Sequence, residues 1–126
     1  MAGFSVSLVN IRVYNLSMDG IMRKFNHVGI PTNEKQENEI ALDAIKCHIT
    51  DFSKSPNRIE WLRFEEGSTF PKLIQTTAHI AYEVENMEKE LANAEIIVEP
   101  FDNGEGTMIA FIVEEGAPIE LMQFKA

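Results

Sequence analysis

Two histidines and two glutamates stand at matching places in two similar stretches of the 126-residue chain. His27 opens the segment His-Val-Gly-Ile, and His79 opens the segment His-Ile-Ala-Tyr. Glu60 is the second residue of Ile-Glu-Trp-Leu-Arg-Phe, and Glu120 is the second residue of Ile-Glu-Leu-Met-Gln-Phe. Imidazole nitrogens and carboxylate oxygens suit a borderline divalent metal such as Zn²⁺, Ni²⁺, Mn²⁺ or Fe²⁺, without choosing among them. The four residues are therefore candidate ligands of one divalent metal ion.

The spacing of these residues indicates an internal repeat of two modules. The separation from histidine to glutamate is 33 residues in the first copy and 41 residues in the second. A first module that is shorter in its middle by eight residues accounts for this difference. Two of the three histidines of the chain thus occupy equivalent points of a duplicated unit.

Residue patterns predict the elements that must position these side chains. Alternating and β-branched stretches predict strands at 24–30, 46–51 and 58–65, and then at 77–84, 95–99, 107–113 and 118–124. A helix is predicted at 86–94, where Asn86 can cap the first turn. Residues 33–44 have only a weak apolar spacing and are predicted as a short helix or an extended loop. The second half therefore follows the order β-α-β-β-β, and the first half follows it less clearly.

Strand alternation places each candidate glutamate on an otherwise apolar face. The neighbours on those faces are Leu62 and Phe64 beside Glu60, and Met122 and Phe124 beside Glu120. A carboxylate on such a face is costly unless it pairs with a charge or binds a metal, and two of them in one cavity would repel each other. A divalent cation removes both costs. In the alternative interpretation the glutamates lie at a solvated face, or pair with Arg58 or Arg63.

The repeated pattern of a first-strand histidine and a last-strand glutamate resembles the vicinal oxygen chelate superfamily. This superfamily includes glyoxalase I, methylmalonyl-CoA epimerase, extradiol dioxygenases, fosfomycin-resistance enzymes and bleomycin-binding proteins. The resemblance covers residues 23–125 and implies an α+β fold in a single domain, 23–126. Two paired βαβββ modules, at about 23–66 and 75–126, would form a curled mixed sheet around a shared cavity. Residues 1–22 are expected to be an N-terminal extension or to add an extra strand through 4–14.

The resemblance also implies a function. It matches His27 and His79 to the histidine ligands of the two modules, and Glu60 and Glu120 to their acidic ligands. The implied enzyme is a glyoxalase-like lyase or isomerase that acts on a small hydroxy-carbonyl compound through a metal-bound enediolate. Glu120, in preference to Glu60, would act as the catalytic base.

Three alternatives stay open beside the glyoxalase-like interpretation. One is a non-catalytic, antibiotic-type small-molecule binding protein of the same fold. Another is a methylmalonyl-CoA-epimerase-like enzyme, although that enzyme usually offers an amide where Glu60 stands. The third is a domain that keeps its metal for structure or regulation. The resemblance further leads us to expect a homodimer, since modules of this type commonly pair across a two-fold axis.

Other chemically active residues are predicted to be structural. His48 has no counterpart in the second module, and Cys47 is expected to be a small buried hydrophobic residue without a nucleophilic role. Trp61 and Arg63 alternate away from the face of Glu60.

Composition limits the partners of the protein. A net charge of −9 argues against nucleic acid and anionic membranes, and disfavours a highly anionic substrate unless a metal or a basic cluster receives it. One cysteine cannot form an internal disulfide. The chain has no apolar run near the ~20 residues that span a bilayer, and its start lacks the pattern of a signal peptide. A cytoplasmic protein with a small-molecule substrate is expected.

Overall fold

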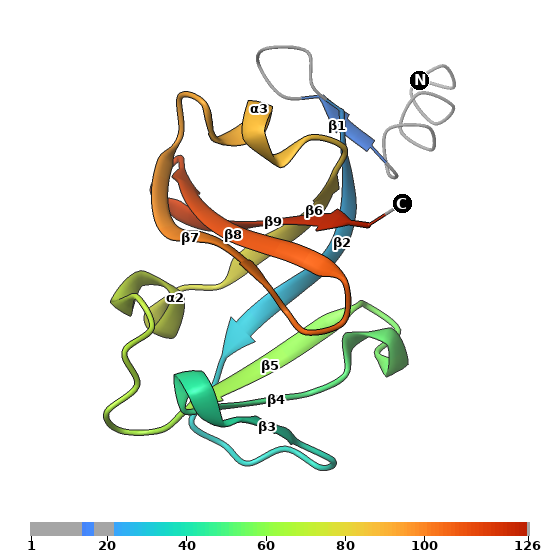
Figure 1. Ribbon diagram of the computed structural model, residues 1–126. Helices are drawn as coiled ribbons and strands as arrows, with labels where there is room; N and C mark the ends of the chain where they lie inside the picture. The colour runs from blue at the N-terminus through green and yellow to red at the C-terminus, as the bar shows by residue number, and fades with distance from the viewer. Residues whose placement is uncertain (1–13, 17–21, 126) are drawn as a thin grey trace, which may run out of the picture.

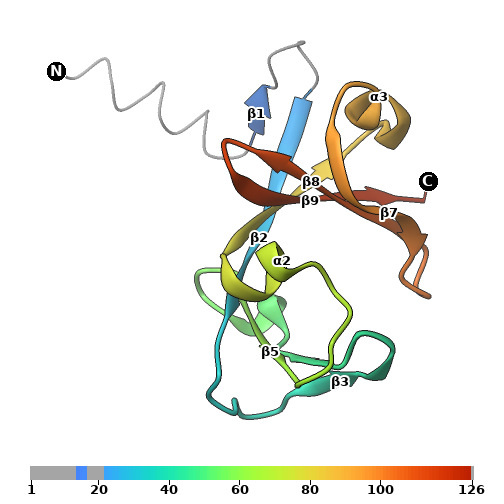
Figure 2. The ribbon, with the colours of Figure 1, turned by 90° about the vertical axis from the view of Figure 1, so that its left-hand side faces the viewer.

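Two strand-rich modules follow one another in the computed structural model, which describes residues 14–16 and 22–125. The first module contains β2 (Met22–Pro31), β3 (Ile40–Leu42), β4 (Cys47–Ile49) and β5 (Ile59–Phe64). The second contains β6 (His79–Val84), α3 (Met87–Leu91), β7 (Glu95–Asp102), β8 (Thr107–Glu114) and β9 (Ala117–Phe124). The helix α2 (Lys72–Thr76) links the modules and lies where they meet, against β2 and β9 (Figure 2).

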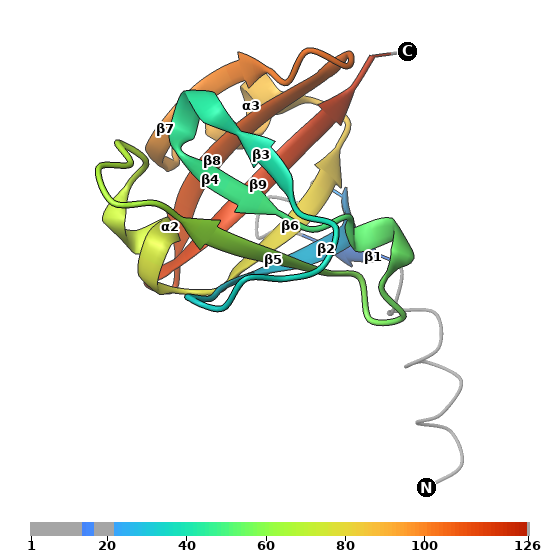
Figure 3. The same ribbon diagram turned by 90° about the horizontal axis from the view of Figure 1, so that it is seen from below.

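The sheet is symmetric about the pair formed by the first strands of the two modules. Its order is β3-β4-β5-β2-β6-β9-β8-β7. The strands β2 and β6 run antiparallel, whereas β5 lies parallel to β2 and β9 lies parallel to β6. The ribbon shows this mixed sheet curling along its length (Figures 1 and 3). The predicted α+β fold of two paired modules is confirmed.

The first module lacks the helix that a complete βαβββ unit would contain. Residues 33–39 form bends and turns, β3 follows directly, and Asp43–Ile45 make one 3-10 turn. The loop alternative for this region is therefore the correct one. The physical reason is length: only eight residues separate the end of β2 from the start of β3, and they are mostly polar. They offer no apolar face that a helix could bury.

The second module has its helix where the sequence predicts it. The side chain of Asn86 accepts a hydrogen bond from the backbone N–H of Lys89 at 3.0 Å and so caps the first turn. Figure 1 shows α3 over the strands of this module. Met87 packs there into the main cluster of buried apolar residues, together with Val84, Ala110, Ile112, Ile119 and Leu121. The helix thus covers one face of the sheet and leaves the other face to Glu120.

Two local predictions differ from the structure. The sequence patterns predict no helix between the strands at 58–65 and 77–84, yet Lys72–Thr76 form a short helix that begins after Pro71. Proline is well tolerated at a helix start, and five residues are too few to show a periodic pattern. The strand predicted at 95–99 extends to Asp102 and includes Pro100. Proline is accepted there because β7 is an edge strand.

The beginning of the chain is described only in part. β1 (Tyr14–Leu16) pairs antiparallel with the first three residues of β2. The strand predicted at 4–14 lies outside the described residues except for Tyr14. The first module has all four of its strands without β1. In the described part of the chain, no helix is long and apolar enough to span a membrane.

Candidate metal centre

The four central strands of the sheet each contribute one candidate ligand. His27 lies on β2, Glu60 on β5, His79 on β6 and Glu120 on β9. One ligand atom from each side chain lies within 4.8 Å of those of the other three. The exposed fraction is 1% for each histidine and 6% for Glu120. One chain therefore brings together all four residues that the repeat singles out.

Strand register explains how four large side chains fit on adjacent strands. Gly29 pairs with Glu60 on one side and with His79 on the other. Ala81 pairs with His27 on one side and with Glu120 on the other. Each module thus places a small residue two positions after its own histidine, directly beside the histidine of the other module.

The distances within the cluster fit a single metal ion. Nε2 of His79 lies 3.0 Å from Oε1 of Glu120, and Nε2 of His27 lies 3.4 Å from the same oxygen. Nε2 of His27 is also 3.7 Å from Oε1 of Glu60. Two ligand atoms that are each ~2.1 Å from one ion can be up to ~4.2 Å apart. The ligand atoms of these three pairs are therefore already close enough together to bind the same ion.

One buried atom tests whether the residues fit a metal. Nε2 of His27 is buried and has no hydrogen-bond partner among the described residues, although it faces two carboxylates. An imidazole nitrogen that is buried without a partner costs free energy, and a bound cation would use its lone pair. Two imidazoles and two carboxylates also form a donor set suited to a borderline divalent ion. The residues present fit the predicted metal.

The two carboxylates differ in their electrostatics. Burial, reinforced by the nearby charge of Glu120, raises the pKa of Glu60 to about 8 against the opposing effect of His27. Burial also works to raise the pKa of Glu120, but interactions with His27 and His79 outweigh it and lower this pKa to about 2. Side by side without a cation, the carboxylates favour opposite protonation states. A divalent cation would favour the ionised form of both.

Aromatic side chains hold the two imidazole rings from outside the cluster. Phe52 stacks on His27 with ring centroids 4.2 Å apart and an interplanar angle of 9°. The guanidinium of Arg58 lies 5.0 Å from the centroid of the Phe52 ring. Phe111 meets His79 edge-on, with centroids 5.2 Å apart. The sequence patterns did not single out these phenylalanines, because Phe52 lies in a turn and Phe111 looks like any apolar strand residue.

Two of the residues predicted to be structural, His48 and Arg63, lie away from the cluster. His48 pairs with Arg63 across β4 and β5, on the face opposite Glu60, and its Nε2 lies 3.4 Å from Glu65. Arg63 forms two hydrogen bonds with Glu39, of 2.7 and 2.9 Å. Because Arg63 has this partner, it does not neutralise Glu60.

Arg58 is not the partner of Glu60 either. Its Nε donates a hydrogen bond to the backbone carbonyl of Asn26. Cys47 is 1% exposed, which confirms the prediction of a buried position.

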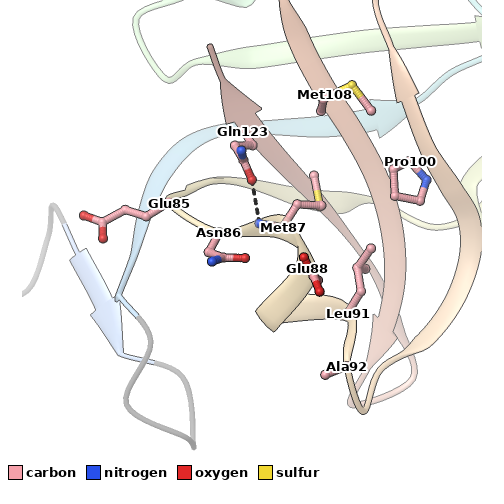
Figure 4. Close-up of a pocket in the computed structure, with 9 residues that line it drawn as sticks. All are labelled: Glu85, Asn86, Met87, Glu88, Leu91, Ala92, Pro100, Met108 and Gln123. Carbon is pink, nitrogen blue, oxygen red and sulfur yellow. Dashed lines mark hydrogen bonds between the residues drawn. The ribbon is translucent and has the colours of Figure 1, made fainter. Parts of the chain in front are cut away.

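A groove on the described part of the chain lies elsewhere on the molecule. It has a volume of about 680 Å³ and is bounded by α3, β7, β8 and β9 (Figure 4). Its residues include Met87, Leu91 and Met108, and the backbone N–H of Met87 donates to Gln123 at 2.6 Å. No candidate metal ligand lines this groove.

Comparisons with known proteins identify structural neighbours. No protein-family model matches the chain, and a search of curated proteins finds no match. The crystal structure of hypothetical protein BH1468 from Bacillus halodurans C-125 superimposes with a TM-score of 0.61 at 22% identity, covering 82% of this chain and 96% of that one. Methylmalonyl-CoA epimerase from Mycobacterium tuberculosis superimposes with a TM-score of 0.54 at 15% identity, covering 81% and 88%. These likenesses show that the chain has the fold implied by the vicinal oxygen chelate resemblance.

Proposed function

We propose that this protein is a metal-dependent isomerase or epimerase that moves a proton on a carbon atom next to a carbonyl group. The observation that carries the proposal is the buried convergence of two imidazoles and two carboxylates from the two modules. A structural neighbour that is named as an epimerase supports this class of chemistry. His27, Glu60, His79 and Glu120 would hold the ion.

The ion would supply Lewis-acid stabilisation of negative charge on substrate oxygens. Its identity among Zn²⁺, Ni²⁺, Mn²⁺ and Fe²⁺ stays open, because nitrogen and oxygen donors suit all four. The residues of the chain would perform the proton transfer itself. A side chain can do this only if it reaches the reacting carbon.

The positions of the two glutamates suit proton removal and proton return. Glu60 and Glu120 lie on opposite sides of the central pair β2 and β6, one in each module. A substrate carbon between them would have one carboxyl group on each side. We assign proton removal to Glu120, as the resemblance implies, and proton return to Glu60, whose side chain is 12% exposed. The buried rings of His27 and His79, backed by Phe52 and Phe111, would keep bulk water from the reacting atoms.

The second candidate is a glyoxalase-like lyase acting on a hydroxy-carbonyl compound. The observation that favours it is the carboxylate of Glu60, where methylmalonyl-CoA epimerase usually offers an amide. A non-catalytic binding protein is a weaker candidate, since such members of the superfamily generally lack the metal-binding set.

A deuterium-exchange assay tests these functions. Protein loaded separately with each of the four metals would be incubated in D₂O with a 2-methyl-branched acyl thioester, or with the thiol adduct of a 2-oxoaldehyde. We expect NMR to show exchange at the carbon next to the carbonyl group for one of these compounds. Exchange of the acyl thioester supports the epimerase, and conversion of the thiol adduct supports the lyase. A metal-loaded protein that exchanges neither would contradict the enzymatic proposal.

We also propose that the protein forms a homodimer. Its long edge strand β7 carries Pro100 and the acidic residues Glu95, Glu99 and Asp102, which disfavour pairing along that edge. The dimer would therefore use another surface. Light scattering on the purified protein in solution measures its mass. A monomeric mass would contradict this proposal.

A further inference from the structure

A β-bulge precedes the histidine of the first module. The register between β2 and β6 shifts between Phe25 and His27, so that Asn26 is an extra residue in β2. Such bulges re-aim side chains and occur often beside functional sites. Asn26 is 6% exposed and lies next to the buried ring of His27. The bulge therefore places a polar side chain within reach of a candidate metal ligand.

The hydrogen bonds of Asn26 define the orientation of its amide group. Its Nδ2 donates to Oε2 of Glu83 at 3.2 Å, and its Oδ1 lies 2.7 Å from Nδ1 of His27. A carboxylate can only accept, so the NH₂ group must face Glu83 and the carbonyl oxygen must face His27. Because that oxygen also only accepts, Nδ1 of His27 must carry a proton. In the neutral ring the lone pair is then on Nε2, the atom that faces Glu60 and Glu120.

We propose that Asn26, itself oriented by Glu83, is a positioning residue that keeps His27 in the Nδ1–H tautomer required for metal binding through Nε2. This inference rests on the proposed metal site. Partners of this kind fix the tautomer and the ring orientation of metal-binding histidines in general. The second module has no equivalent, because Nδ1 of His79 has no hydrogen-bond partner among the described residues. The two histidines are therefore held differently, although the repeat makes them equivalent in sequence.

The metal-free protein supplies the first test. Long-range ¹H–¹⁵N spectra of protein labelled at histidine distinguish the tautomers, and the signals of His27 are those lost in His27→Ala. The spectra are recorded as the pH is raised, until they no longer change. We expect a protonated Nδ1 for His27 in the wild type, and a mixture or a reversed tautomer in Asn26→Ala. A wild-type His27 with its proton on Nε2 would overturn the proposal.

A paired substitution separates positioning from a merely structural role. In the double variant Asn26→Asp/Glu83→Gln, the new amide at position 83 can donate to the new carboxylate at position 26. That carboxylate can still accept from Nδ1–H of His27. We expect this variant to recover the Nδ1–H tautomer that Asn26→Ala loses. If a folded double variant does not recover this tautomer, the proposed positioning of His27 by residues 26 and 83 is contradicted.

Zn²⁺ affinity, measured by competition with a chromophoric chelator, is the second readout. We expect a 10- to 100-fold loss in Asn26→Ala, the usual effect of removing such a partner, and recovery in the double variant. Asn86→Ala is the matched control, since it removes the exposed cap of α3, which does not touch His27, and tests for general destabilisation. Unchanged affinity in Asn26→Ala would overturn the proposal. If no Zn²⁺ binds the wild type but its tautomer is as expected, the metal function fails and the positioning by Asn26 stands.

Discussion

The imidazole ring of His79 lies directly against the backbone of Gly29. A Cβ atom added at Gly29 would be 2.1 Å from Cε1 of His79, and 2.5 and 2.6 Å from its two ring nitrogens. No real Cβ contact is this short, so the ring and a side chain at position 29 exclude each other. The two residues are paired neighbours on β2 and β6, the strands that join the modules.

This contact predicts the effect of Gly29→Ala. The added methyl group must push the His79 ring away from the cluster, so we expect metal affinity to fall sharply and unfolding free energy to fall by about 1–3 kcal/mol, as for other overpacked sites. A double-mutant cycle with His79→Ala provides the control. In that background the ring is absent, and Gly29→Ala should cost little stability. Equal costs in both backgrounds, measured by urea unfolding, would show that the contact is not the cause.

Metal binding should depend on the paired histidines and not on the third. We expect about one divalent ion per chain by elemental analysis. We also expect an affinity loss beyond ~100-fold in His27→Ala and in His79→Ala, because both remove a direct ligand. His48→Ala should leave affinity unchanged, since this residue lies on the other sheet face near Glu65. Loss of binding in His48→Ala alone would mean that the modules are wrongly aligned.

The two glutamates should be separable by amide substitution. Glu120→Gln should keep much of the metal affinity and lose exchange activity by at least about 100-fold, the scale of positioned acid–base catalysis. Glu60→Gln should impair proton return more than proton removal, which single-turnover exchange and product formation measure separately. Full activity in Glu120→Gln would refute its role as the base.

The thiol of Cys47 should be inert in the native protein. Burial above all, with the nearby charge of Glu60, raises its pKa to about 12. A raised thiol pKa favours the neutral form, so little thiolate is present below about pH 12, and the side chain is also 1% exposed. A chromogenic disulfide reagent at pH 8 should react only when the protein unfolds. A fast reaction of the folded protein would contradict this environment.

Removal of residues 1–21 should leave the core intact. The described part of this segment adds only the three pairings of β1 to β2, and the first module has its four strands without it. We expect the truncated protein to fold, to bind metal, and to lose no more than about 5 °C in Tm, equivalent to roughly 1 kcal/mol. Insolubility or loss of metal would show that the segment belongs to the sheet core.

The sequence by itself determined the two-module organisation and the four residues that meet at its centre. Both follow from local regularities. Repeated segments imply equivalent strands, and strand alternation decides which side chain shares a face with which. The helix at Met87–Leu91 was also predictable, since its cap, Asn86, lies next to it in the chain. The sequence indicated the missing helix of the first module only through the smaller number of residues between His27 and Glu60.

Only the tertiary structure decided how the candidate ligands are supported. The stacking of Phe52 on His27, the need for glycine opposite His79, and the bulge at Asn26 all join residues on different elements. No periodic pattern encodes such contacts, because they depend on the register of β2 against β6 and on the path of a turn. The residues that could do chemistry can therefore be identified from the sequence. Their orientation is set by contacts that exist only once the strands have paired.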